Sequence, residues 1–154
     1  MTYTRKPCDA SGYLLWQISN LWQRMINDTL AQHGITHVQF LLLATIVWMN
    51  NNDMTVNQNS LARQAKSHKM MTSKVLRNLE KNGLVTRSRN SIDTRYKDIH
   101  ITDKGFETHQ AVQKVFKKED TKFFEKIERN KFSLNKIFSD IIEENKVGTS
   151  PGHA

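Results

Sequence analysis

Cysteine, proline and glycine are scarce in this sequence. Its 154 residues include one cysteine, two prolines and six glycines. The single cysteine, Cys8, excludes an internal disulfide framework and is typical of the reducing cytoplasm. Because proline interrupts helices, its scarcity is compatible with long helical segments. The sequence therefore predicts a cytoplasmic protein that is mainly α-helical.

Apolar runs long enough to span a membrane are also missing. The longest run, residues 40–49, is interrupted by Thr45, and a bilayer crossing requires roughly 20 apolar residues. Residues 1–12 contain no apolar segment of the kind found in a secretory signal. We therefore expect no leader peptide and no membrane partner.

Motifs that carry catalysis are absent as well. The sequence has no glycine-rich phosphate loop and no nucleophile motif, and Cys8 lacks a positioned base. The adjacent acids at 119–120 and 143–144 are expected to be solvated helix charges rather than an acid and base pair. We expect no enzyme, no catalytic residue and no cofactor.

Positive charge, in contrast, is concentrated in one part of the chain. The formal net charge is +8, and residues 63–98 hold ten lysines and arginines but only three acids, a net charge of +7. A block of one sign binds polyanions because it holds phosphates and releases their counterions. The block coincides with two helices and a hairpin, which favours nucleic acid over a solvated basic face without a partner.

Apolar spacing predicts six helices and one hairpin. In the helical segments apolar residues recur about every 3.6 positions, and in the strands they alternate with polar ones. The helices are expected over about residues 11–33 and 67–82, after the N-caps Thr36 and Asn57, from the N-cap Thr102 to about Glu128, and from about Ser133. The strands are expected at 84–89 and 96–102. This order describes a mainly α fold with a small β-hairpin wing.

Residues 36–102, with three helices and a hairpin, describe a winged helix-turn-helix. Such motifs place their second helix in the major groove of DNA. Lysine and arginine can pair there with guanine, serine with either base type, and methionine with the methyl group of thymine. The candidate DNA contacts at the start of the second helix are His68, Lys69, Met70, Ser73, Lys74 and Arg77. Lys81, further along, is expected to be a solvated charge.

The predicted hairpin carries further basic residues. Arg87 and Arg89 precede its tip, which contains Asp93 and Arg95. An arginine at the end of a narrow loop can enter a minor groove and sense its width, and a neighbouring aspartate can orient it by a charge-assisted hydrogen bond. We therefore expect these four residues to belong to the DNA-binding surface.

Five short motifs follow one another in a specific order. They are Gly34-Ile35-Thr36-x-x-Gln39-Phe40, Leu61-Ala62, Val75-Leu76-Arg77-Asn78-Leu79-Glu80-Lys81-Asn82-Gly83-Leu84-Val85, Asp93-Thr94-Arg95 and Ile101-Thr102-Asp103-Lys104-Gly105. Together they resemble the MarR family of bacterial transcriptional regulators, and the resemblance covers about residues 11–145. By position, it implies that Ser73, Lys74 and Arg77 face the major groove and Arg95 the minor groove. The methionines at 70–71 depart from the family pattern, which is often small or polar there.

The resemblance also implies a homodimer that reads double-stranded DNA. Residues 36–102 would form the DNA-binding domain, residues 1–35 and 103–146 a helical dimerisation region, and residues 147–154 a disordered tail. Two winged lobes would bind a pseudo-palindromic operator, and an effector would release the repressor. Physical reasoning favours the dimer, because wide apolar stripes at both chain ends need a partner. The alternative is that these helices pack on one another within one chain.

A small-molecule site is expected between the dimerisation helices and the winged lobe, as the resemblance implies. The candidates are the aromatic or polar residues Tyr13, Trp16, His37 and Trp48. The simpler interpretation, which the sequence favours, is that the tryptophans belong to the core.

Two other interpretations remain open. The winged module could use its basic face to contact an acidic protein partner. The same frame could instead sense oxidants or metal, since Arg5 and Lys6 lie near Cys8 and positive charge lowers the pKa of a thiol. The six histidines have no spacing typical of a structural zinc site, so we expect no metal ligand.

Overall fold

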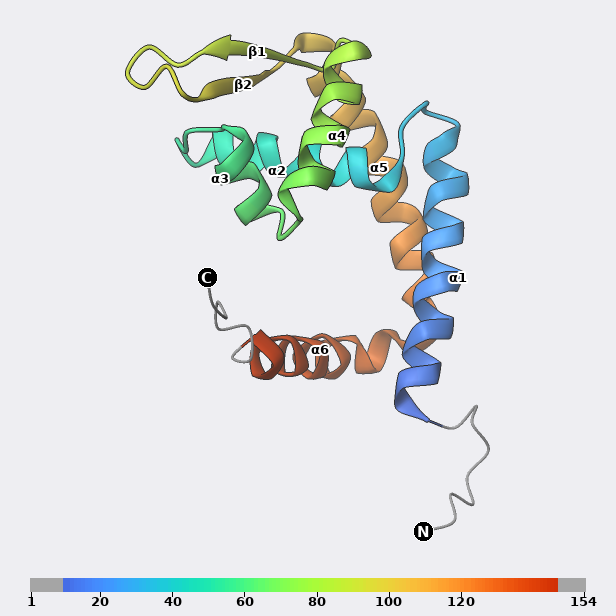
Figure 1. Ribbon diagram of the computed structural model, residues 1–154. Coiled ribbons are helices and arrows are strands. Elements are labelled where there is room, and N and C mark those ends of the chain that lie inside the picture. Colours follow the sequence, from blue (N-terminus) through green and yellow to red (C-terminus); the bar gives the residue numbers. More distant parts are fainter. Residues whose placement is uncertain (1–9, 147–154) are drawn as a thin grey trace. The chain divides into compact units, whose positions relative to one another are not determined.

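The computed structural model describes residues 10–146, which form two compact units, one ending at Glu119 and one beginning at Asp120. Cys8, His153 and the predicted tail at 147–154 lie outside the described residues. In chain order the elements are α1 (Ser11–Ala31), α2 (His37–Asn51), α3 (Gln58–Gln64), α4 (Lys69–Lys81), β1 (Val85–Arg89), β2 (Lys97–Ile101), α5 (Asp103–Phe124), the 3₁₀ helix η2 (Glu125–Asn130) and α6 (Lys131–Lys146) (Figure 1). None of the helices described within 10–146 has the length and apolar content of a membrane span.

The predicted capping residues begin their helices as expected. The hydroxyl of Thr36 accepts a hydrogen bond from the backbone N of Gln39 at 3.3 Å, and the Gln39 side chain accepts one from the backbone N of Thr36 at 2.8 Å. Asn57 Oδ1 accepts from two backbone amides in the first turn of α3, each at 3.0 Å. Thr102 caps α5 in the same way at 3.0 Å. Because caps act within a few residues, local sequence is enough to predict them.

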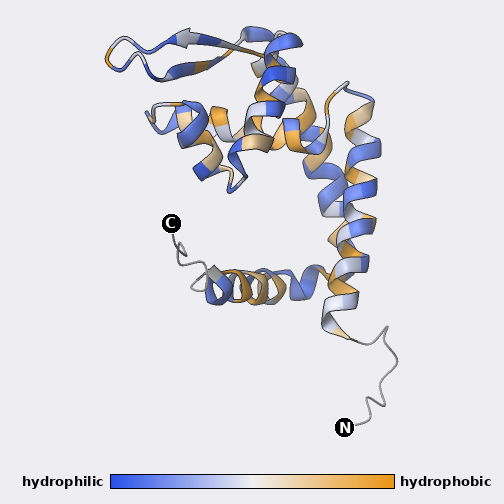
Figure 2. Cartoon of the chain, in the orientation of Figure 1, coloured by the Kyte–Doolittle hydropathy of each residue, from blue (hydrophilic) through white to orange (hydrophobic). Residues whose placement is uncertain are grey.

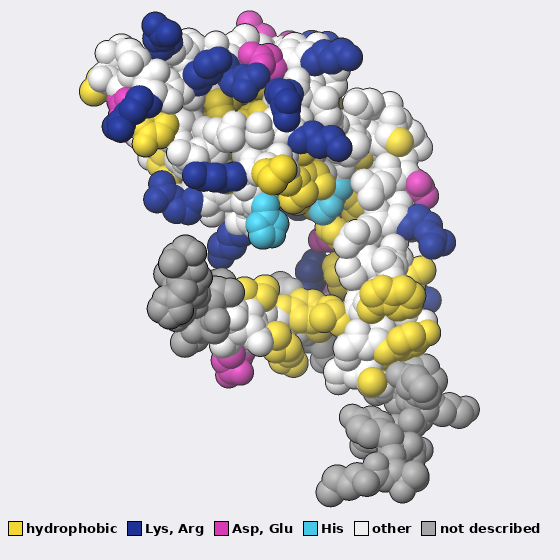
Figure 3. Space-filling view, viewed as in Figure 1, with side chains coloured by type: hydrophobic (Ala, Val, Ile, Leu, Met, Phe, Trp, Pro, Cys, Tyr) yellow, Lys and Arg dark blue, Asp and Glu magenta, His cyan; other side chains and the backbone are white. Residues whose placement is uncertain are grey.

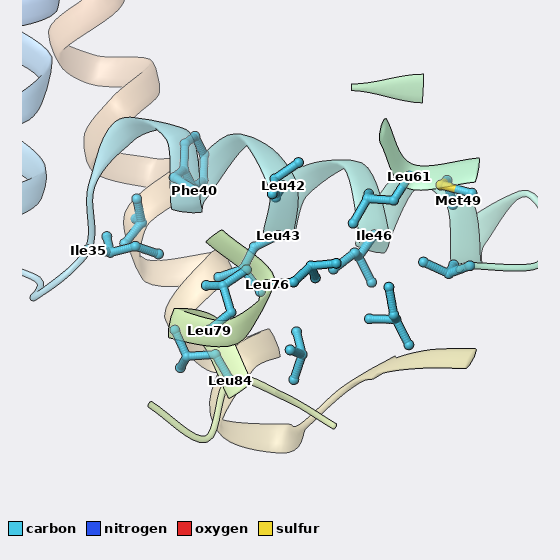
Figure 4. Close-up of a cluster of buried hydrophobic side chains, with 14 of the residues drawn as sticks. Ile35, Phe40, Leu42, Leu43, Ile46, Met49, Leu61, Leu76, Leu79 and Leu84 are labelled. Carbon is cyan, nitrogen blue, oxygen red and sulfur yellow. The ribbon is translucent and has the colours of Figure 1, made fainter. Parts of the chain in front are cut away.

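The core of the first unit is built around α2. Apolar residues concentrate where α2 meets α4 and α5 (Figure 2). Burying a side chain of leucine or isoleucine size contributes about 1.5–3 kcal/mol relative to leaving it in water. The fully buried side chains include Leu43 and Ile46 of α2, Leu61 of α3, and Leu76 and Leu79 of α4 (Figure 4). Ile26 and Leu30 of α1, Val85 of β1 and Val112 of α5 are fully buried as well. The winged lobe therefore shares its core with parts of α1 and α5.

The hairpin is fixed to the helical core at its base. β1 and β2 pair antiparallel, with Val85 opposite Ile101. The backbone N of Ile99 in β2 donates to the carbonyl O of Val56 at 2.8 Å. The base of the wing is therefore hydrogen-bonded to the segment that precedes α3, while its tip extends beyond the helices (Figure 1).

The turn between α3 and α4 uses two residues that the sequence assigned to the helix. α4 begins at Lys69, whereas apolar spacing predicted a start near Ser67. Lys66 has a φ of +50°, and the backbone N of Ser67 donates to the carbonyl O of Ala62 at 2.9 Å. Ser67 thus closes the turn, and His68 becomes the N-cap residue.

The fifth helix ends earlier than the sequence predicted. α5 stops at Phe124, whereas apolar markers suggested about Glu128. In the following η2, Ile127 has a φ of −115° and a ψ of 15°, outside the helical range. No glycine or proline lies at this bend, and apolar residues continue through it at helical spacing. The sequence therefore contains no signal that the helix ends here. α6 starts at Lys131, slightly before the predicted Ser133.

A substitution at Gly105 tests how closely α5 packs against the base of the hairpin. A Cβ there would overlap the carbonyl O of Leu84 and lie 2.9 Å from Cγ1 of Ile101. We expect Gly105→Ala to lower the free energy of unfolding by about 1–3 kcal/mol, measured by thermal and urea unfolding. In the control Gly12→Ala, a Cβ meets nothing within 4 Å, and stability should stay constant or rise by up to about 1 kcal/mol. Equal stability of the two variants would contradict this packing.

Candidate nucleic-acid interface

α4 exposes one face because its apolar residues share the other. Thr72, Leu76 and Leu79 are fully buried, at the spacing that puts them on one side of a helix. The Thr72 hydroxyl donates to the carbonyl O of His68 at 3.1 Å, which gives this buried group a partner. Met70 lies away from the core and is 87% exposed. The core thus determines which side of α4 meets solvent.

The exposed face of α4 holds the residues that the sequence predicted as base contacts. Lys69, Lys74 and Arg77 are exposed, and Ser73 is half-buried. Arg77 Nε donates to the carbonyl O of Ser73 at 3.4 Å, so the arginine lies along the helix. His68 is exposed at the N-cap. A shallow concavity of about 270 Å³ is lined by Gln58, Lys69, Met70, Ser73 and Arg77. It joins four predicted residues to Gln58, which the sequence analysis missed.

The wing tip holds an exposed arginine beside an aspartate. Asn90 Oδ1 accepts hydrogen bonds from the backbone N of Ile92 at 2.9 Å and of Asp93 at 2.8 Å. Arg95 Nη2 donates to Asp93 Oδ2 at 2.7 Å, and its Nε donates to Oδ1 at 3.0 Å. These bonds lower the pKa of Asp93. The expected contact is therefore present, and it orients a side chain that is still 82% exposed.

Arg87 is engaged in an ion pair that the sequence analysis did not predict. Its Nε donates to Oε2 of Glu80 at 2.9 Å, and its Nη2 also contacts this oxygen. The hydrogen bond from Arg87 lowers the pKa of Glu80. Glu80 belongs to α4 and Arg87 to β1, so this ion pair connects the helix to the strand. No sequence signal indicates it, because helix and strand meet only after folding.

A second concavity lies between the wing and the start of α3. It encloses about 300 Å³ and is lined by Asn57, Gln58, Asn59, Arg87, Arg95, Tyr96, Lys97 and Ile99. Arg89 is exposed and pairs with Lys97 in the strand register. Lysine and arginine side chains gather over α4 and the hairpin with few acids among them (Figure 3). The amides of α3 were missed because no local pattern indicates that they lie beside the wing.

Within the single described chain, the four candidate ligand residues lie in separate places. Tyr13 and Trp16 contact each other in α1, with ring centroids 5.7 Å apart. His37 and Trp48 lie near opposite ends of α2, and Trp48 lines a separate groove with Leu41. The interpretation that these tryptophans belong to the core is wrong within the single chain, because Trp16 is 60% and Trp48 50% exposed.

His37 instead belongs to an aromatic cluster that joins α1, α2 and α5. Its ring lies 5.0 Å from that of Trp22, edge to face, and is stacked 5.9 Å from that of Phe116. His109 stacks on Phe40 at 5.9 Å. Nε2 of His37 and Nδ1 of His109 are buried without a hydrogen-bond partner among the described residues. The helical spacing of the aromatic residues was the available signal for this cluster.

Metal-ligand groups are not assembled within residues 10–146. In that part of the chain, no three histidine, cysteine, aspartate or glutamate side chains lie close enough to hold an ion. Cys8, the candidate for redox sensing, lies outside the described residues. The candidate surface that the described residues do form is the cationic one, and a turn-linked helix pair followed by a basic hairpin defines a winged helix-turn-helix protein.

Sequence comparison identifies the family. A family model described as the MarR family matches residues 35–97. YdcH of Bacillus subtilis (strain 168), an uncharacterised HTH-type transcriptional regulator, is 39% identical over 118 residues, which cover 77% of this chain and 80% of YdcH. The chain therefore belongs to the MarR family of transcriptional regulators.

Solved structures share the fold. The chain of the S. aureus MepR–DNA complex matches with a TM-score of 0.73 and 26% identity, over 85% of this chain and 98% of MepR. The transcriptional repressor CouR, solved on a 23-mer DNA duplex, matches with a TM-score of 0.78 and 21% identity, over 90% of this chain and 99% of CouR. The predicted winged helix-turn-helix fold is confirmed.

Acidic pH should destabilise the aromatic cluster. Burial lowers the pKa of His37 and of His109 from the ordinary value of 6.5. The unfolded chain therefore takes up these protons first as the pH falls. The free energy of unfolding should be highest above about pH 6.5 and should decrease as the pH falls towards about 5. Thermal unfolding across this range measures the effect before most carboxylates titrate.

His109→Gln, which removes one titrating ring, isolates this contribution. Its Tm should decrease less than that of the wild type over the same pH interval. His33→Gln, at an exposed position, serves as the control and should follow the wild type. The same pH dependence in all three proteins would show that the buried rings do not cause it.

Proposed function

We propose that this protein is a homodimeric repressor that binds a specific site on double-stranded DNA and is released by a small-molecule effector. The observation that carries the proposal is that α4 and the wing together present a cationic surface (Figure 3). MepR, which is 26% identical, has been solved in a complex with DNA. Since the proposed target is chromosomal DNA, we expect the protein in the bacterial cytoplasm.

α4 is the proposed reading helix. The major groove is wide enough to admit an α-helix. Lys69, Lys74 and Arg77 offer donors to guanine or to phosphate, and Ser73 can pair with either base type. The exposed thioether of Met70 can contact the methyl group of thymine, which is an apolar feature of the major groove. This set of side chains supports sequence-specific binding.

The wing is the proposed minor-groove element. Arg95 is exposed and oriented by Asp93, so little freedom is lost when its guanidinium enters a narrow groove. Arg89 is exposed near the same end of the hairpin. Arg87 has a second role, because its ion pair with Glu80 links the wing to α4. We propose that the wing adds affinity where A·T-rich sequence narrows the minor groove.

A homodimer is supported by apolar side chains at both ends of the described chain. In α1, Leu14, Ile18 and Leu21 follow helical spacing and are 43–58% exposed. In α6, Ile137, Ile141 and Ile142 are exposed as well. Contiguous apolar surface of this kind typically marks an interface. We propose that residues 1–35 and 103–146 pair with a second copy, which leaves residues 36–102 to bind DNA.

The aromatic cluster is the proposed point of effector action. His37 Nε2 and His109 Nδ1 are buried polar atoms without a partner among the described residues, and a ligand can supply the missing hydrogen bonds. CouR, which shares the fold, has been solved with p-coumaroyl-CoA. A shift of α2 relative to α1 and α5 would change the distance between two reading helices. Binding would weaken because half-sites lie about one helical turn apart.

Two arginine variants test the groove assignments. Arg77→Ala should relax discrimination at one base pair by about 1–3 kcal/mol, because a base-edge contact is lost. Arg95→Ala should weaken binding most at sites with A·T-rich flanks. Gel-shift titration on sites selected from a random duplex pool measures both effects.

Lys114→Ala, which removes an exposed cation of α5, is the matched control and should bind like the wild type. Wild-type affinity in both arginine variants would disprove the groove assignments. A shallow salt dependence on random duplex DNA would instead favour an acidic protein as the partner.

Ile18→Glu tests the dimer. A carboxylate in the apolar stripe of α1 should be excluded from a buried interface, so the variant should become monomeric. Sedimentation equilibrium gives the mass, and affinity for a two-half-site operator should fall about 100-fold or more as the second lobe is lost. Asn20→Glu, an exposed position on the other side of α1, should remain dimeric. A monomeric wild type would contradict the assembly.

A further inference from the structure

We propose that Gln58 and Asn59, together with Lys97, bind one backbone phosphate of the DNA strand that runs between the two grooves. This inference rests on the proposed DNA binding and adds a phosphate site that involves neither the reading face of α4 nor the tip of the wing. In a duplex, each strand separates a major groove from the neighbouring minor groove. A protein that enters both grooves must therefore accommodate the strand between them.

Gln58 occupies the position where that strand would pass. It lines the concavity formed with Lys69, Ser73 and Arg77 of α4, and it also lines the one formed with Arg95 and Lys97 of the wing. The two concavities therefore meet at the first residue of α3. A strand between a groove occupied by α4 and a groove occupied by the wing would cross this residue.

The side-chain amides of Gln58 and Asn59 are available as donors. Neither forms a hydrogen bond with another side chain or backbone group among residues 10–146. Gln58 is half-buried and Asn59 is exposed. The amide of Asn57 is different, because its Oδ1 already accepts the backbone N of Asn59 and of Ser60. Asn57 thus holds the turn, and its two successors can donate to a phosphate oxygen.

Backbone pairing holds the start of α3 and the base of the wing together. Asn57 forms an antiparallel bridge with Asp98, and Ile99 donates to Val56 at 2.8 Å. Asn90 Nδ2 donates to the carboxylate of Asp98 at 2.9 Å. These bonds set the distance between the amides of α3 and the side chain of Lys97. The proposed site is therefore formed before DNA arrives, which limits the entropy lost on binding.

Three cations line the concavity, and two of them are held by carboxylates. Arg87 is paired with Glu80, and Arg95 with Asp93. Lys97 also lines the concavity and has no carboxylate within ion-pair distance among the described residues. Its charge can therefore meet a phosphate, and the neutral amides supply directed hydrogen bonds to the same group.

Gln58→Glu and Gln64→Glu provide a matched test. Both replace glutamine by an acid in α3, but Gln64 lines the groove of Leu41 and Trp48. With sites selected from a random duplex pool, Gln58→Glu should bind at least about tenfold more weakly, because it opposes a phosphate. Gln58→Ala should lose about three- to tenfold, equally at matched and mismatched sites, since no base contact is removed. Gln64→Glu should bind like the wild type, and circular dichroism and Tm verify folding of all three.

Two further measurements locate the contact. Lys97→Ala should reduce the slope of log affinity against log salt by about 1, whereas Gln58→Ala should leave it unchanged. In ethylation interference, ethylation of the contacted phosphate in each half-site should block binding of the wild type. Ethylation of that same phosphate should no longer affect binding of Gln58→Ala. Equal binding by Gln58→Glu and Gln64→Glu, or an unchanged interference pattern, would overturn the phosphate site while leaving DNA binding intact. Failure of the wild type to bind duplex DNA would instead overturn the proposed function.

Discussion

The burial of Leu76 and Leu79, on the inner side of α4, is the contact on which the rest of the proposed DNA-binding surface depends. Successive residues of a helix are rotated by about 100°, so anchoring these two leucines fixes the direction of every other side chain of α4. Val85, at the start of β1, belongs to the same core. The direction in which the wing leaves the lobe is therefore determined by the same packing that orients α4, the proposed reading helix.

Acidic residues organise the cationic surface more than they neutralise it. Glu80 joins α4 to β1 through Arg87, and Asp93 orients Arg95 at the tip of the wing. Exposed ion pairs of this kind contribute little to stability, because solvent screens their charges. Their effect is mainly geometric, because each holds a flexible arginine in one place. Lys97, without such a partner among the described residues, keeps the surface positive next to the amides of α3.

Two features of the single chain are unfavourable in a folded domain. Leu14, Ile18 and Leu21 are apolar but exposed, whereas ring nitrogens of His37 and His109 are buried without partners among the described residues. Exposing apolar side chains to water is unfavourable, and so is burying a polar atom without a hydrogen bond. In the proposed dimer, a second copy would cover the apolar side chains. In the proposed regulation, a ligand would form hydrogen bonds with the ring nitrogens.

The sequence by itself determined the order of helices and hairpin, the caps at Thr36 and Asn57, and the basic surface of α4. These features depend on periodicity, capping and charge within a few residues. Only the tertiary structure decided that Arg87 pairs with Glu80, that Gln58 lies beside Lys97, and that His37 contacts the rings of Trp22 and Phe116. These relations arise from packing between distant segments, and no local pattern records which segments will meet.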